Sequence, residues 1–115
     1  MSDLTQRRCL PCEGGATTLS PDQVRHYLTM VPSWKLTADG QRICRHWRVK
    51  DFVTALDFFN RIGRIAEDED HHPDLHVTGY RNVAVEIWNH AVGGLTENDF
   101  ILAAKIDTLP VELKR

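Results

Sequence analysis

The chain has 115 residues, of which 42% are hydrophobic and 26% charged, so it has the length and composition of one ordinary globular domain. Its 14 basic and 16 acidic side chains give a formal net charge of −2. This balance excludes a strong basic field that would hold nucleic acid or bind an anionic membrane. No apolar run is long enough to span a bilayer, and none follows Arg7 and Arg8 as a signal peptide requires. We therefore expect a soluble single-domain protein of the cytoplasm.

Residues 1–18 have no sustained apolar period and contain one proline and two glycines, which predicts a flexible N-terminal arm before a domain over residues 19–115. The arm contains a CxxC pair, Cys9 and Cys12, and the only other cysteine is Cys44. An odd number of cysteines argues against a disulfide framework, and the chain lacks the further ligands that a zinc finger needs. Two interpretations of the pair stay open: it belongs to an arm with no chemical role, or it binds a metal or undergoes redox chemistry.

Apolar periodicity and turn residues predict seven elements in the rest of the chain. In chain order, they are a helix at 21–30, strands at 34–36 and 43–49, a helix at 51–70, strands at 74–78 and 83–88, and a helix from 97 to Pro110. Ser20 and Gln23 form a capping box at the start of the first helix, and Thr96 caps the last one. This α-β-β-α-β-β-α order predicts an α+β two-layer sandwich, with a four-stranded antiparallel sheet and helices on one face.

The helix at 51–70 has a wide apolar stripe that is expected to face the core. Its members are Phe52, Ala55, Leu56, Phe59, Ile62, Gly63 and Ala66. The inner stripe of the last helix consists of Phe100, Ala103, Ala104 and Ile106. Trp34 and Trp47 are expected in the hairpin core, whereas Trp88 lies on the outer face of the sheet. Because so small a domain covers a wide stripe poorly, we expect a homodimer or a homotetramer.

Four of the six histidines fall between positions 71 and 90, in a stretch rich in carboxylates. His71 and His72 are adjacent, and Pro73 restricts His72 to an extended backbone, so the two rings point to opposite sides of the chain. Nearby carboxylates favour the protonated imidazole and proton donation near neutral pH. His90 ends the next strand. The residues alone leave surface polar side chains, an acid–base site and a metal site open, although adjacent histidines are poorly placed to bind one ion.

One ordered motif resembles the signature of the pterin-4a-carbinolamine dehydratases. It consists of Glu67, His71, His72, Pro73, Tyr80, His90 and Asp99. The resemblance extends over residues 18–108 and implies the same sandwich fold and an assembly of dimers or tetramers. It implies that the protein removes water from a 4a-hydroxytetrahydropterin to give the quinonoid dihydropterin, with no metal or cofactor. Since an aromatic amino-acid hydroxylase produces this substrate, such a hydroxylase is a candidate partner.

The resemblance also implies roles for individual residues. His71, His72 and His90 form the acid–base set. The residues that bind the pterin or support its site are Glu67, Asp70, Pro73, Tyr80, Trp88, Asn89, Ala91 and Asp99. Leu75 and Asn98 depart from the family pattern, since many members have an aromatic residue at the first position and some have Arg at the second. Some animal members act as a dimerisation cofactor for a homeodomain transcription factor, so a protein-binding function without essential catalysis is the alternative.

Overall fold

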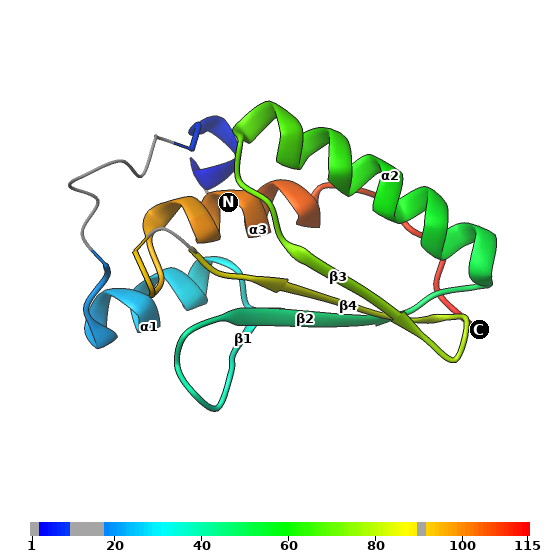
Figure 1. Ribbon diagram of the computed structural model, residues 1–115, viewed down its shortest axis with the longest axis horizontal. Coiled ribbons are helices and arrows are strands. Elements are labelled where there is room, and N and C mark those ends of the chain that lie inside the picture. The colour runs from blue at the N-terminus through cyan, green and yellow to red at the C-terminus, as the bar shows by residue number, and fades with distance from the viewer. Residues whose placement is uncertain (1–2, 10–17, 90–91) are drawn as a thin grey trace.

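The computed structural model describes residues 3–9, 18–89 and 92–115. Its elements, in chain order, are the 3-10 helix η1 (Asp3–Gln6), α1 (Pro21–Met30), β1 (Lys35–Leu36), β2 (Ile43–Arg48), α2 (Phe52–Glu69), β3 (Asp74–Thr78), β4 (Asn82–Ile87) and α3 (Glu97–Asp107). The predicted α+β sandwich is confirmed. Figure 1 shows α2 and α3 packed together over one face of the sheet, with α1 against α3 at one end. Within the described ranges, none of the helices has the length and apolarity needed to cross a membrane.

The four strands form one antiparallel sheet in the order β1-β2-β4-β3. The register pairs Arg45 of β2 with Val85 of β4, and Leu75 of β3 with the same Val85. Side chains alternate between the faces, so Val83 and Val85 are buried beneath the helices. Trp47 of β2 is buried as expected. The sheet therefore has one face in the core and one polar face on the outside.

Capping residues determine where the helices begin, as the sequence predicts. Ser20 Oγ accepts a hydrogen bond from the Gln23 N–H at 3.2 Å, and Gln23 Oε1 accepts one from the Ser20 N–H at 2.8 Å. Asp51 Oδ1 accepts a hydrogen bond from the Thr54 N–H at 2.9 Å before the first turn of α2. These bonds satisfy N–H groups that have no partner within their own helices.

The buried face of α2 differs from the predicted stripe. Phe58, which the stripe omitted, is fully buried, whereas Phe52 and Leu56 are 46% and 44% exposed. The buried positions Ala55, Phe58, Ile62 and Ala66 follow one another at intervals of three or four residues. These four residues form a narrow line that faces the core. Phe52 and Leu56 of the predicted stripe lie nearer the solvent, because α3 and the sheet cover only that line.

The last helix, α3, is buried on almost every side. In addition to the predicted inner stripe, its buried residues include Asn98, Asp99, Ile101 and Leu102. The helix contacts α1, α2, β4 and η1, so few of its side chains reach solvent. A helix with neighbours all around buries polar residues too, and each of these then needs a hydrogen-bond partner.

Residues 3–9 differ from the expectation of a flexible arm. They include η1, and the side chain of Leu4 is fully buried in the core cluster. Figure 1 shows η1 beside α3 and close to the end of α2. One buried apolar residue in a polar stretch has no periodicity, so the sequence pattern does not predict that Leu4 is buried. Residues 10–17 of the predicted arm, including Cys12, lie outside the described residues.

Candidate active site

His71 lies at the junction between α2 and β3. Asp70 ends α2 in the left-handed conformation, with φ at 51°, and its N–H donates to the carbonyls of Ala66 and Glu67. The N–H of His71 also donates to the carbonyl of Ala66, at 3.1 Å. This left-handed turn directs the chain back over the helix end, in the manner of a common C-terminal cap. As a result the side chain of His71 is buried, with about a tenth of it exposed.

Asp99 is fully buried and holds the ring of His71. Its Oδ1 lies 2.6 Å from Nε2 of His71, and its Oδ2 accepts a hydrogen bond from the Thr96 N–H at 2.8 Å. An ionised carboxylate only accepts, so Nε2 of His71 carries the proton in this pair. The other ring nitrogen, Nδ1, takes no part in this contact, and its orientation is determined by the carboxylate.

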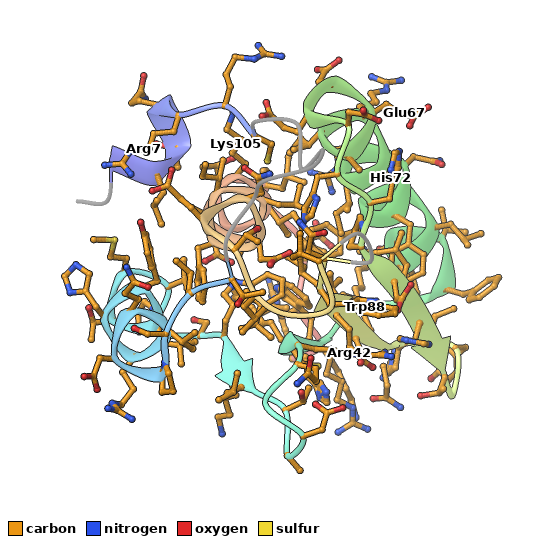
Figure 2. All side chains as sticks on the ribbon, turned by 60° about the vertical axis from the view of Figure 1, so that its left-hand side comes forward. Arg7, Arg42, Glu67, His72, Trp88 and Lys105 are labelled. Carbon is orange, nitrogen blue, oxygen red and sulfur yellow. The ribbon has the colours of Figure 1, made fainter. Side chains whose placement is uncertain are left out.

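His72 forms the second histidine–carboxylate pair. Its Nε2 lies 2.6 Å from Oε2 of Glu67 in the last turn of α2, and both side chains are exposed. Figure 2 shows Glu67 and His72 next to one another at that helix end. The sequence predicted that adjacent rings point to opposite sides, and one ring is buried while the other is in solvent. The two histidines therefore differ in their access to water.

Trp88 lies on the outer face of the sheet, where its ring and its N–H both have partners. The guanidinium carbon of Arg42 lies 4.4 Å from the ring centroid, and Trp88 Nε1 donates to Oδ2 of Asp74 at 3.0 Å. Arg42 also donates to Oε1 of Glu86 at 3.2 Å. Figure 2 shows Arg42 and Trp88 together on the sheet. Asp74 begins β3, directly after Pro73, so this cluster adjoins the histidine junction.

Asn89 is buried and organises the start of the loop after β4. Its side-chain oxygen accepts a hydrogen bond from the Val92 N–H at 3.2 Å, and its carbonyl accepts one from the Gly93 N–H at 3.0 Å. His90 and Ala91, which the family resemblance assigns to catalysis and binding, lie outside the described residues. Asn89 therefore holds the backbone of Val92 and Gly93, which follow these two residues.

Of the other predicted site residues, Pro73 lies beside the histidines and Tyr80 does not. Tyr80 is in the turn between β3 and β4, is 56% exposed, and has the Arg81 guanidinium over its ring at 4.8 Å. Since β3 separates this turn from Pro73 at about 3.3 Å per residue, Tyr80 lies at the opposite end of the hairpin. The structure brings together Glu67, Asp70, His71, His72, Pro73 and Asp99.

The structure adds a buried carboxylate that the sequence analysis did not single out. Glu69 is 7% exposed, and its two oxygens accept hydrogen bonds from Lys105 Nζ at 2.8 Å and from the Cys9 N–H at 2.7 Å. Burial alone raises the pKa of Glu69, but the bonds from Lys105 and Cys9 outweigh it and lower the pKa. The hydrogen bonds to Glu69 come from segments that are distant in the sequence, so no local sequence pattern predicts its burial.

Cys9 belongs to the predicted CxxC pair, and its environment suppresses the thiolate. Burial, followed by the charge of Glu69, raises the pKa of Cys9 to about 12. The thiol is therefore protonated at neutral pH, which disfavours a nucleophilic role. Across residues 3–9, 18–89 and 92–115, no three His, Cys, Asp or Glu side chains are grouped in a way that would hold a metal ion.

Comparison with known proteins identifies the family. The family model described as pterin 4 alpha carbinolamine dehydratase matches residues 17–109. Pterin-4-alpha-carbinolamine dehydratase 2, mitochondrial, of Arabidopsis thaliana is 49% identical, and the match covers 97% of this chain and 62% of the plant protein. A Halorhodospira halophila protein with the same dehydratase name is 45% identical over 92% of this chain and 96% of its own length.

A solved structure shows the same relationship. The crystal structure of a transcriptional coactivator/pterin dehydratase from Brucella melitensis matches with a TM-score of 0.75 and 29% identity, over 80% of this chain and 97% of that one. The resemblance recognised in the histidine motif is thus confirmed by independent comparisons of sequence and of fold. The chain belongs to the pterin 4 alpha carbinolamine dehydratase family, a family of lyases.

Proposed function

We propose that this chain dehydrates a 4a-hydroxytetrahydropterin by acid–base catalysis from its histidines. The observation that carries the proposal is the pair of adjacent imidazoles, each with Nε2 2.6 Å from a carboxylate oxygen. In both pairs the carboxylate contacts Nε2 and leaves Nδ1 for proton transfer. A junction that presents two such nitrogens supplies both the acid and the base that the reaction needs.

The reaction breaks one C–O bond and moves two protons. The bond between C4a and the hydroxyl oxygen breaks, and a general acid donates a proton to that oxygen so that water leaves. A general base takes the proton from N5, and the electron pair of the N–H bond forms the double bond between N5 and C4a of the quinonoid dihydropterin. The electron pair of the broken C–O bond leaves with the water, and the pair of the N–H bond replaces it at C4a. The pterin is neither oxidised nor reduced, so atoms and charges balance with proton transfer alone.

The different exposure of the two rings suggests their roles. Nδ1 of buried His71 is the base, because a proton accepted there produces an imidazolium whose Nε2–H still faces Asp99. Exposed His72 is the acid, because water restores its proton after each turnover. His90 remains the third member that the family motif implies. Asp70, Pro73, Trp88, Asn89 and Ala91 are proposed to hold the pterin next to these rings.

A protein-binding function is the second candidate. The Brucella melitensis relative is titled a transcriptional coactivator as well as a dehydratase. The α2 helix exposes apolar side chains, with Phe52, Val53 and Leu56 at 46%, 73% and 44%. Such a surface fits a second copy of this chain or another protein equally well. A homo-oligomer, a hydroxylase partner and a cytoplasmic location all stay predictions.

One preparation tests both candidates. The decay of a 4a-hydroxytetrahydropterin is measured with and without the wild-type protein, and the same batch is used in a pull-down. Dehydration accelerated by substoichiometric protein supports the proposal. A protein that captures a partner and leaves the decay at its spontaneous rate refutes catalysis and supports the binding function.

A further inference from the structure

The N-terminal segment, residues 3–9, lies outside the region that matches the family model and nonetheless packs beside the histidine junction. Leu4 fixes it to the core, where its side chain is fully buried. Figure 2 shows Arg7 of this segment on the same side of α3 as Lys105. Ordering seven residues in this way costs conformational entropy, so contacts must offset it.

The segment contacts both elements that meet at the junction. Arg7 NH1 lies 2.7 Å from Oε2 of Glu97 in the first turn of α3. Arg8 NH2 donates to the carbonyl of Asp68 at 3.1 Å, in the last turn of α2. The carbonyls of a last helical turn have no partner within the helix, so this guanidinium satisfies one of them. Two neighbouring arginines thus hold the end of one helix and the start of another.

Cys9 completes the connection through its backbone. Its N–H donates to Glu69 Oε1 at 2.7 Å, and Glu69 Oε2 accepts a hydrogen bond from Lys105 Nζ at 2.8 Å. The carboxylate therefore joins the N-terminal segment, the end of α2 and the last turn of α3. A buried carboxylate with both oxygens occupied is geometrically restrained, and removing one partner leaves the charge poorly compensated.

The contact among Cys9, Glu69 and Lys105 lies in the same region as the bond between His71 and Asp99. Glu69 precedes His71 by two residues, and Lys105 follows Asp99 by six residues on α3. Both contacts connect the end of α2 to α3. A displacement of one helix relative to the other changes both distances together.

We propose that Glu69 and Lys105, together with the backbone N–H of Cys9, are positioning groups that hold His71 on Asp99 for catalysis. None of them touches the reacting atoms. The kinetic part of this inference rests on the proposed dehydratase function, whereas its spectroscopic part concerns His71 alone. In this proposal the N-terminal segment contributes to the geometry of the active site.

The experiment replaces Lys105 by Met in the full-length chain. Small misplacements of a catalytic group are costly, so we expect kcat to fall about tenfold or more. KM is expected to stay within about twofold, because in this proposal Lys105 acts through His71 and not on the substrate. Lys105→Arg retains a cationic donor and should recover most of kcat. The hydrogen-bonded imidazole N–H signal of His71 in the proton NMR spectrum should shift or broaden in Lys105→Met and return in Lys105→Arg.

Asp51→Ala is the matched control, because it removes the N-cap at the other end of α2 and lowers stability without touching the junction. Its kcat per folded molecule should equal that of wild type. If Lys105→Met does not fold, Glu69→Gln carries the same test with the shape of the side chain retained. Wild-type kcat and an unchanged His71 signal in these variants would overturn the proposal. An inactive wild-type protein would refute the dehydratase function instead, and the NMR comparison would still decide this inference.

Discussion

Asp99 Oδ1 lies 2.6 Å from Nε2 of His71, and the bond joins residues 28 positions apart at a fully buried carboxylate. The second oxygen of Asp99 binds the Thr96 N–H, so the carboxylate is fixed by the helix that it caps. A group with both oxygens occupied has little freedom to rotate. The ring of His71 is therefore oriented by the start of α3 rather than by its own neighbours in sequence.

The first prediction concerns the three histidines of the motif. Replacing His71, His72 or His90 singly by Ala should slow dehydration at unchanged fold, because each removes an acid–base group. Such groups usually contribute about 10²- to 10⁴-fold, and we expect the lower end because dehydration also proceeds spontaneously. Turnover of each variant is measured beside a circular-dichroism melt.

His26 and His46 provide matched controls for that series. Both side chains are exposed and lie on α1 and β2, away from the junction. Their Ala variants should retain wild-type turnover. A loss in His46→Ala as large as that in His72→Ala, at equal stability, would mean that the site is misplaced.

The second prediction concerns the reactivity of Cys9. With its pKa raised to about 12 by burial and by Glu69, almost none of this thiol is ionised at pH 8. We expect iodoacetamide to modify Cys9 far more slowly in the folded protein than in urea, as followed by peptide mass spectrometry. Rapid modification of Cys9 in the folded state would contradict the buried placement and would revive a redox role for the CxxC pair.

The third prediction concerns stability in acid. Glu69 has its pKa lowered below the ordinary value of 4.5 in the folded protein. A lowered folded-state pKa adds stability that is complete above the unfolded pKa and disappears as the pH falls through the folded pKa. The difference in Tm between wild type and Glu69→Gln should therefore be largest near neutral pH and should shrink below pH 4.5.

Glu112→Gln is the control for this pH series, because Glu112 pairs with Lys50 at an exposed site. Exposed pairs contribute little, so its Tm should follow that of wild type throughout. A Tm difference between wild type and Glu69→Gln that stays constant down to pH 3 would show that the charge of Glu69 does not contribute to stability. That result would remove the electrostatic basis of the contact with Lys105.

The fourth prediction concerns assembly. Val53 and Leu56 expose apolar surface on α2, and we expect a second copy to cover it. Light scattering at micromolar concentration should report a dimer or a tetramer, and Leu56→Glu should shift the mass toward 13.2 kDa. His46→Ala serves as the unaffected comparison. A wild-type protein that is monomeric under these conditions contradicts the expected homo-oligomer.

Local signals explain why much of the fold was predictable. The capping residues Ser20 and Thr96 mark helix starts, and the period of two identifies the strands. The different exposure of His71 and His72 also agrees with local geometry, because adjacent side chains alternate in an extended chain. These features depend only on residues that are close together in the sequence.

Contacts between distant segments account for what the sequence analysis missed. Phe58 is buried because α3 and the sheet cover that line of α2, and Leu4 is buried because η1 packs against α3. Glu69 finds its partners on two other segments. Tyr80 belongs to the sequence motif, yet the length of β3 places it at the far end of the hairpin. The contacts of Leu4 and Glu69 have no period or spacing that a sequence pattern contains, whereas Phe58 follows the helical spacing of Ala55, Ile62 and Ala66.

The central claim is that protein side chains alone perform the proton transfers. Stopped-flow absorbance of 4a-hydroxytetrahydropterin decay, recorded with wild-type protein after exhaustive dialysis against EDTA, tests it most directly. We predict that the dialysed protein accelerates the decay as strongly as the untreated protein, and that added zinc changes nothing. Loss of the acceleration on dialysis, with recovery on adding zinc, would contradict acid–base catalysis by the histidines.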